Sequence, residues 1–391
     1  MHLTREKVQN YIFAKHHVLP GTQCATVEEC SDSLVGIHSA RLPTPYFALN
    51  ARVADFSPAS LISSLHEKRR MLKLRCMRRT LHSVTRELAP IVHQATLDVR
   101  IRECARHFET HELSAAKLRR LFRHLEKAAA QEPLPPRTIY ALAENWLRPR
   151  LKNATSAELK FLAKRSVKYA WEVGVLCYIN RSKAWGAETR LYGSTLAYYP
   201  SFNLNSLSES EAIKALVRWY LEAFGPVSFD DLCWWAGIST RKLRAGLAAL
   251  GRQCRKIAVD DLHDELLLLD TDWQKLQRFK CEQDEWVALL AYEDPTLKGY
   301  FETRHRYLDR AIYDDVFNQI GEVRPTIVVG GQVVGIWSWN KKTQRIVTKL
   351  LKPISRTARQ KLKKIVCETE HRFSGSAELN ESAKGTEPLC A

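Results

Sequence analysis

Lysine and arginine side chains are concentrated in two short stretches of this sequence. Residues 67–79 contain seven basic side chains and one acid, Glu67, and residues 341–364 contain ten basic side chains and no acid. Such side chains bind phosphate oxygens through charge and through charge-assisted hydrogen bonds. A solvated surface also explains a basic run, so phosphate binding and simple exposure both remain open for these two stretches.

The helices that could carry such contacts are best defined between Ser208 and Leu250. Ser208 and Glu211 have the spacing of a capping box at the start of an amphipathic helix that ends at Gly225-Pro226. A second, short helix is predicted from the cap Ser228 to Gly237. These signals lie close together and predict two helices joined by a tight turn.

A third helix is predicted at residues 240–250, with a cap at Ser239 and an outer face that carries Arg241, Lys242 and Arg244. Two short runs of strand-forming residues, 256–259 and 265–270, follow it with a polar turn between them. A basic helix after a tight turn, with a hairpin behind it, predicts a winged helix-turn-helix. Three ordinary amphipathic helices in a core are the alternative.

Length and charge limit the possible functions. At 391 residues the chain is long enough for two to four modules, and its formal net charge of +17 favours a polyanionic partner, nucleic acid before an acidic membrane. No apolar run approaches the roughly 18 residues that span a bilayer, and the start lacks a signal-peptide pattern. The ten cysteines have no zinc-site spacing. We therefore expect a cytosolic protein with reduced thiols, no metal and no cofactor.

The order helices, then a two-stranded hairpin, is predicted three times along the chain. The expected units are residues 1–110, 111–205 and 206–284. Helices are predicted at 4–17, 26–35, 46–53, 58–66, 83–110, 113–130, 137–147 and 156–173. Hairpin strands are predicted at 71–77 with 80–84, and at 175–180 with 189–199.

The remaining chain has a different pattern. Strands are predicted at 285–292, 324–329 and 332–339, and a helix is predicted to begin near Pro353, which makes residues 285–371 a β-rich segment with a basic helix. Residues 372–391 are poor in apolar side chains and are predicted to be a disordered tail. The predicted fold class is α+β and mainly helical, with three tandem winged helix-turn-helix units and a C-terminal β-rich segment.

Several motifs follow one another in the order typical of a known family. Tyr220, Gly225-Pro226, Asp231, Trp235 and Gly237 fit the pattern Ryl-x-x-yGP-x-x-x-x-d-x-x-x-W-x-G. Residues 289–295 resemble an LLP-x-FDP box, 304–306 an R-x-R, 324–337 an RPT-x-LV-x-G-x-x-x-G-x-W hairpin, and 78–82 an R-x-TLH. Together these motifs resemble the bacterial winged-helix DNA glycosylases of the AlkZ and YcaQ (AlkX) type over most of the chain.

The resemblance implies three tandem winged helices around a positive channel for double-stranded, damaged DNA. It also implies a monomer that excises bulky N7-alkylated purines and unhooks interstrand crosslinks. The catalytic pair of the family is Gln-x-Gln or Gln-x-Asp, and His38-Ser39-Ala40 occupies that place here. His38 then becomes the candidate catalytic residue, since a histidine can position a water and accept its proton. Ala40 can hold nothing, and His38 could equally be a packed structural residue.

The resemblance and the basic runs together predict the residues that contact DNA. They are Arg41, Arg78, Arg79, His82, Arg304, Arg306, Arg324, Lys341, Lys342 and Arg345. A non-catalytic winged-helix protein, either a regulator or a relative that shields damage, is the alternative to a glycosylase. Ala40 favours this alternative, and the surrounding motifs favour the glycosylase.

Overall fold

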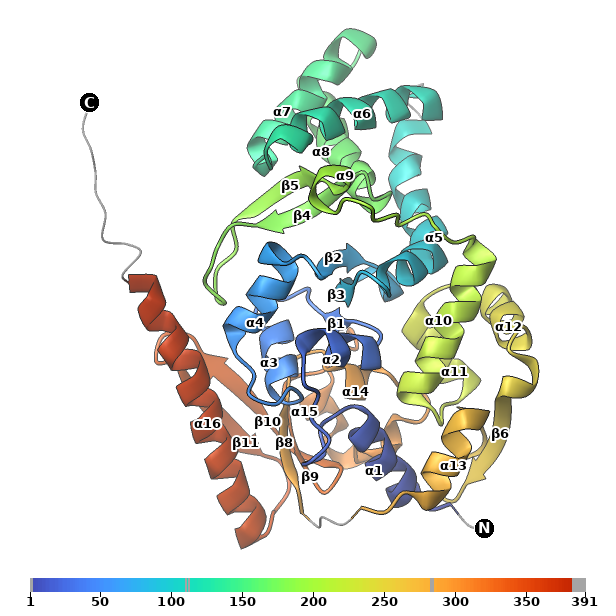
Figure 1. Cartoon of the computed structure of the whole chain (residues 1–391), viewed down its shortest axis with the longest axis vertical. Coiled ribbons are helices and arrows are strands. Elements are labelled where there is room, and N and C mark those ends of the chain that lie inside the picture. Colours follow the sequence, from blue (N-terminus) through green and yellow to red (C-terminus); the bar gives the residue numbers. More distant parts are fainter. Residues whose placement is uncertain (1–2, 110, 112, 282–284, 382–391) are drawn as a thin grey trace.

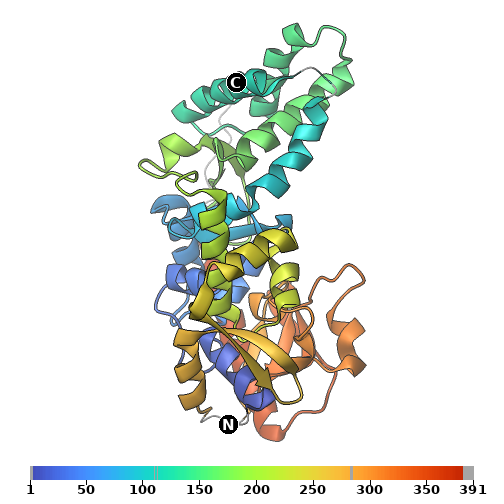
Figure 2. The ribbon, with the colours of Figure 1, turned by 90° about the vertical axis from the view of Figure 1, so that its right-hand side faces the viewer.

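A computed structural model describes residues 3–109, 111, 113–281 and 285–381 of the chain. The N-terminal and C-terminal regions of the described chain pack together. Three helices form a lobe at one end of the long axis (Figures 1 and 2). These helices are α6 (Ala115–Gln131), α7 (Pro136–Leu147) and α8 (Ser156–Glu172). Within the described ranges, no helix combines the length and the hydrophobicity needed to cross a membrane.

The N-terminal helices lie beside a small three-stranded sheet. They are α1 (Arg5–Lys15), α2 (Val27–Ser33), α3 (Thr44–Asn50) and α4 (Pro58–Ile62). Strands β2 (Met71–Arg75) and β3 (Leu81–Thr85) form the predicted hairpin, and β1 (Ile37–His38) pairs with the other edge of β3. The predicted cap at Thr4 is confirmed, because its side chain accepts from the Lys7 amide. No strand was predicted at residues 37–38, so this third strand is a correction to the sequence-based prediction.

Two boundaries in the second region differ from the predictions. Helix α5 spans Ala89–Glu109, so the predicted start at Ser83 is wrong, because Ser83 pairs with both neighbouring strands inside β3. Strands β4 (Leu176–Asn180) and β5 (Arg190–Ser194) form a hairpin. The predicted strand 189–199 is too long, since the Ser194 hydroxyl accepts from the Ala197 amide and caps the short helix α9 (Thr195–Tyr198).

The helices predicted around Ser208 are confirmed. They are α10 (Glu209–Phe224), α11 (Phe229–Ala236) and α12 (Thr240–Ala248), and the hairpin of β6 (Cys254–Val259) and β7 (His263–Leu269) follows before α13 (Asp270–Arg278). Ser208 forms the capping box with Glu211. Gly237 has a left-handed φ of 65°, and a Cβ there would lie 2.9 Å from the Arg78 Cα. Glycine at this position therefore lets α11 end directly against the turn between β2 and β3.

The C-terminal region is a four-stranded antiparallel sheet in the order β11-β10-β9-β8. Its strands are β8 (Val287–Leu290), β9 (Thr326–Val329), β10 (Gln332–Asn340) and β11 (Arg345–Leu350), and the short helices α14 (Pro295–Lys298) and α15 (Tyr313–Val316) lie between β8 and β9. The sequence analysis missed β11. Helix α16 (Arg356–Glu381) runs along the outer side of this sheet (Figure 1).

The predicted disordered tail is wrong for residues 372–381, which continue α16. Phe373 is 0% exposed, and its ring lies 4.6 Å from that of Phe47 and 4.7 Å from that of Trp185. This burial explains why the helix extends past Arg372. The rest of the predicted tail, residues 382–391, lies outside the described residues.

The fold as described is mixed α/β with four small sheets among these residues. Helices followed by a two-stranded hairpin occur three times, with β2–β3, β4–β5 and β6–β7. The count of three winged-helix units remains a prediction.

Candidate functional site

His38 lies at the end of β1, where alternate side chains point to opposite faces of the sheet. The neighbouring Ser39 is buried and its hydroxyl bonds the Ser83 hydroxyl at 2.8 Å. His38 points to the other face and is 7% exposed, and among the described residues no group bonds its Nδ1 atom. Ala40, two residues on, is exposed. A buried polar atom without a partner is rare in folded proteins and marks a place where a water or a ligand can bind.

His38 forms part of the wall of a cavity of about 30 Å³. The polar and charged wall residues are His38, Arg78, Thr80, His82, Glu293 and Lys298, and the remaining wall residues are Leu34, Val35, Gly36, Met77, Trp235 and Pro295. A cavity of this size holds one or two water molecules, since one water needs at least about 10–15 Å³. The structure therefore brings together three predicted site residues, His38, Arg78 and His82, in one water-sized space.

The electrostatics of the cavity keep both histidines neutral. Burial, followed by the nearby charges of His82, Lys298, Arg78 and Arg41, lowers the pKa of His38 to about 2. Burial and Arg78 also lower the pKa of His82 to about 4. A neutral imidazole can hold a water by a hydrogen bond. The expectation that His38 also accepts a proton is not favoured by this environment.

Arg78 forms one side of the cavity and stacks on Trp234, which lies outside the cavity wall. Arg78 has a left-handed backbone with φ 51°, and its guanidinium lies 3.9 Å over the ring of Trp234. Burial lowers the pKa of Arg78 and of Lys298, the latter to about 8. Arg304 lies over the same Trp234 ring at 5.1 Å. Two cationic side chains, Arg78 and Lys298, thus lie in the cavity wall together with one acid, Glu293.

Arg304 and Arg306 do not reach the surface. Arg304 donates to the Tyr313 hydroxyl and to the Tyr300 carbonyl, and Arg306 donates to Thr303 and to the carbonyl of Pro226. Arg306 is only 1% exposed. Their prediction as DNA contacts finds no support in this geometry, because buried guanidinium groups that bond the protein are not available to phosphates.

The other predicted DNA contacts are exposed, namely Arg41, Arg79, Arg324, Lys341, Lys342 and Arg345. Arg41 stacks on Tyr292 at 3.7 Å and pairs with Glu322 at 3.4 Å. Arg41 and Lys341 line a second, larger groove of about 870 Å³. The structure thus separates a small cavity around His38 from a wide groove with cations along its wall.

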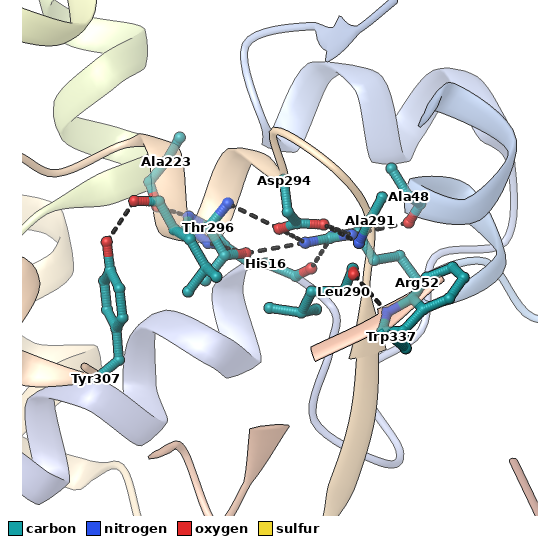
Figure 3. Close-up of polar contacts among 11 residues, drawn as sticks. His16, Ala48, Arg52, Ala223, Leu290, Ala291, Asp294, Thr296, Tyr307 and Trp337 are labelled. Carbon is teal, nitrogen blue, oxygen red and sulfur yellow. Dashed lines mark hydrogen bonds and ion pairs between the residues drawn. The ribbon is translucent and has the colours of Figure 1, made fainter. Parts of the chain in front are cut away.

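A buried ion pair fixes the segment that carries Glu293 and Lys298 (Figure 3). Arg52 bonds both carboxylate oxygens of Asp294, at 2.6 and 2.9 Å, and both side chains are 0% exposed. Arg52 also donates to the Thr296 hydroxyl, and His16 bonds the same hydroxyl. The start of α14 is therefore tied to α1 and to the residues that follow α3.

The sequence analysis missed Glu293 and Lys298 as site residues. The sequence shows these two charged residues after the apolar run 287–291. Charged residues that follow a strand are also common in solvated loops, so they did not indicate a site. Their meeting with His38 depends on contacts between distant parts of the chain. Within the described ranges, no three His, Cys, Asp or Glu side chains lie close enough to share a metal ion.

Comparisons with known proteins identify a family and a similar fold. The family model described as DNA glycosylase AlkZ-like matches residues 32–371. Among solved structures, the DNA glycosylase AlkZ of Streptomyces sahachiroi matches with a TM-score of 0.77 over 96% of this chain and 98% of that chain, at 18% sequence identity. Similarity at this level of identity shows the fold. No curated protein matches the chain.

Proposed function

Because the chain belongs to the AlkZ-like DNA glycosylase family, we propose that it hydrolyses the N-glycosidic bond of bulky N7-alkylated purines in double-stranded DNA. It acts as a cytosolic monomer, leaves the DNA backbone intact and also unhooks interstrand crosslinks formed through such purines. The observation that carries this proposal is the unpartnered Nδ1 of buried His38 at a water-sized cavity.

The chemistry requires little beyond a well-placed water. An N7-alkylated purine carries a positive charge and leaves as a neutral base, so the reaction needs a nucleophile at C1′ and stabilisation of an oxocarbenium-like transition state. The Nδ1 atom of His38 gains its missing hydrogen bond when it holds that water. His38 then replaces the first amide of the family motif as a neutral water-binding group.

The positive charge supports binding to the DNA backbone. The first winged-helix unit would position the exposed Arg41 and Arg79, and the C-terminal sheet the exposed Lys341 and Lys342, along the phosphates. These contacts carry no sequence information and fit an enzyme that searches any sequence for damage.

Single-turnover release of N7-methylguanine and unhooking of a crosslinked duplex test the proposal. We expect His38→Ala to slow release about 10²–10⁴-fold, the usual range for a group that acts on the reacting proton or water. His38→Gln should retain more activity, because an amide can still hold the water. His66→Ala is the matched control, since His66 also has a buried, unpartnered Nδ1 but lies outside the cavity.

A second candidate function is non-catalytic binding to damaged DNA. The exposed Ala40 favours it, because this side chain offers no polar group at the place of the second amide. Wild-type protein that binds both duplexes and releases no base would support this alternative and contradict hydrolysis.

A further inference from the structure

Glu293 is a buried carboxylate in the wall of the cavity that contains His38. It is 6% exposed, and among the described residues it is the only acid that lines this space. Its backbone has a left-handed φ of 53°, a conformation that residues other than glycine adopt infrequently. The Glu293 amide donates to the Val323 carbonyl at 3.0 Å, which holds the backbone in place.

The described contacts of the Glu293 carboxylate are made by one of its two oxygens. The Val323 amide donates to Oε1 at 2.7 Å, and the Lys298 ammonium lies 2.9 Å from the same oxygen. Lys298 also donates to the Gly321 carbonyl. The described contacts therefore fall on Oε1, and Oε2 remains the oxygen on which a water in the cavity can be held.

Two of the departures from the family motifs meet in this cavity. His38 occupies the place of the first catalytic Gln, and Glu293 occupies the place of Phe in the LLP-x-FDP box. One exchange replaces an amide by an imidazole, and the other introduces a carboxylate beside it. A neutral imidazole with a pKa of about 2 cannot keep a proton taken from water at neutral pH. The proton therefore needs another acceptor, and Glu293 is the carboxylate in the cavity wall.

We propose that Glu293 accepts the proton of the attacking water while His38 holds that water, an assignment that rests on the proposed glycosidic hydrolysis. The bond between C1′ and N9 breaks, and its electron pair moves to the purine and cancels the positive charge. The water oxygen forms the new bond to C1′, and its proton passes to the Glu293 carboxylate. The negative charge of Glu293 also stabilises the positive charge that develops on the sugar.

Base release from an N7-methylguanine duplex under single-turnover conditions tests Glu293→Gln against the wild type. Glutamine keeps the volume and an oxygen for the Val323 amide but cannot accept a proton. We expect release to slow about 10²–10⁴-fold, the usual range for general acid–base catalysis, with duplex affinity within twofold. The variant should lack one limb of the wild-type pH–rate profile, because glutamine does not titrate. An E293Q rate within threefold of wild type, or an unchanged pH profile, overturns the proposal.

The pH profile also depends on the other charged or titratable groups that line the cavity beside Glu293. These groups are Lys298 on α14, Arg78 in the turn between β2 and β3, His38 on β1 and His82 on β3. Lys298 is the one whose pKa, about 8, lies near the assay range. The double variant E293Q/K298M removes both charges of the pair and relieves the unpaired lysine. If it folds stably and is still slow, loss of the carboxylate is the cause. If it regains the wild-type rate, the proposal is overturned.

Asn318 provides the control for a purely structural role. Its Oδ1 accepts from the Ile320 and Glu322 amides, so it holds the same loop that Glu293 and Lys298 hold, but it does not line the cavity. Asn318→Ala should keep the wild-type rate and pH profile. If Asn318→Ala slows release as much as E293Q, the effect of E293Q is explained by a loosened loop and the proposal is overturned. If wild-type protein releases no base, the proposed function itself fails, whereas an active wild type with an active E293Q removes only this assignment.

Discussion

His38 and His82 are direct cross-strand partners on β1 and β3, with ring centroids 5.5 Å apart and planes at 87°. The Nδ1 atom of His82 lies 3.2 Å from the Thr80 carbonyl, so this nitrogen carries the proton of the neutral ring. Two neutral rings packed edge to face hold His38 in one orientation against the cavity. Because both rings are buried in the neutral form, the same arrangement makes the stability of the protein depend on pH.

Acid should destabilise the protein below about pH 6.5, the ordinary pKa of histidine. The pKa is lowered for five histidines, His16, His38, His66, His82 and His93. The unfolded chain therefore binds more protons than the folded chain below that pH, and stability falls as pH falls. Asp32, with a pKa raised to about 6, and His17, whose pKa is raised, against the effect of burial, by hydrogen bonds to Cys24 and to the Thr22 carbonyl, oppose the trend.

Thermal unfolding at pH 7.5, 6.5 and 5.5 checks this expectation. The melting temperature should fall at each step, and a His66→Phe variant should show a shallower decline because one of the five protons is removed. A melting temperature at pH 5.5 equal to that at pH 7.5 would contradict the burial of these neutral rings.

Asp294→Asn should destabilise the fold strongly. The variant leaves the Arg52 guanidinium, 0% exposed, without its carboxylate, and breaking one partner of a buried ion pair costs about 3–5 kcal/mol. Denaturant unfolding gives the free energy directly. Glu144→Gln is the matched control, because its partner Arg148 is 57% exposed and such a pair is worth about 0.5 kcal/mol or less. Equal effects of the two variants would show that the Asp294 pair does not hold α14.

Local signals accounted for much of the fold. The capping box of Ser208 with Glu211 and the left-handed Gly237 act within one helical turn, and both helices were predicted from them. Strand β1 was missed because its two residues form a strand only through pairing with Ser83 and His82. Strand β11 was hidden in a basic run, although its residues pair with β10 over six positions.

The candidate site could be predicted only in part for the same reason. The place of His38 in the order of motifs identified it, although the strand that carries it was not predicted. Glu293 and Lys298 join it only because the Arg52–Asp294 pair ties the start of α14 to the N-terminal helices. Arg304 and Arg306 are the reverse case. Their motif was interpreted as a DNA contact, but both guanidinium groups are buried and donate hydrogen bonds to other residues of the protein.

Phe373→Ala should lower stability by about 3–5 kcal/mol, the usual cost of removing a buried Phe ring. Phe373 is 0% exposed and also contacts Trp339, so its loss opens a space beneath α16. Truncation after Arg372 should have at least the same effect in thermal unfolding. Val347→Ala is the control, since Val347 is 56% exposed and such changes cost about 0.5 kcal/mol or less. A truncated protein that melts like the full chain would contradict the role given to Phe373 and favour the earlier prediction of a disordered tail.

The turn between β10 and β11 should bind the phosphates of flanking DNA. Lys341 and Lys342 are exposed there, whereas Arg345 already pairs with Glu370 at 2.6 Å and is left unchanged. The double variant K341Q/K342Q should weaken damaged and undamaged duplexes alike, because phosphate contacts do not read bases. The slope of log K against log salt should fall by up to about 0.9 for each phosphate that a lysine no longer neutralises.

Titrations of both duplexes at several salt concentrations measure this slope. Lys349→Gln on β11 is the matched control, since the Lys349 ammonium pairs with Asp315 at 3.2 Å and has a carboxylate partner within the protein. Its removal should change the slope less than either neighbour in the turn. Two exposed lysines in a turn are solvated whether or not they bind DNA. A smaller release of counterions by the variant than by the wild type is therefore the result that distinguishes phosphate binding from simple exposure. An unchanged slope in K341Q/K342Q would return the turn to the solvated interpretation.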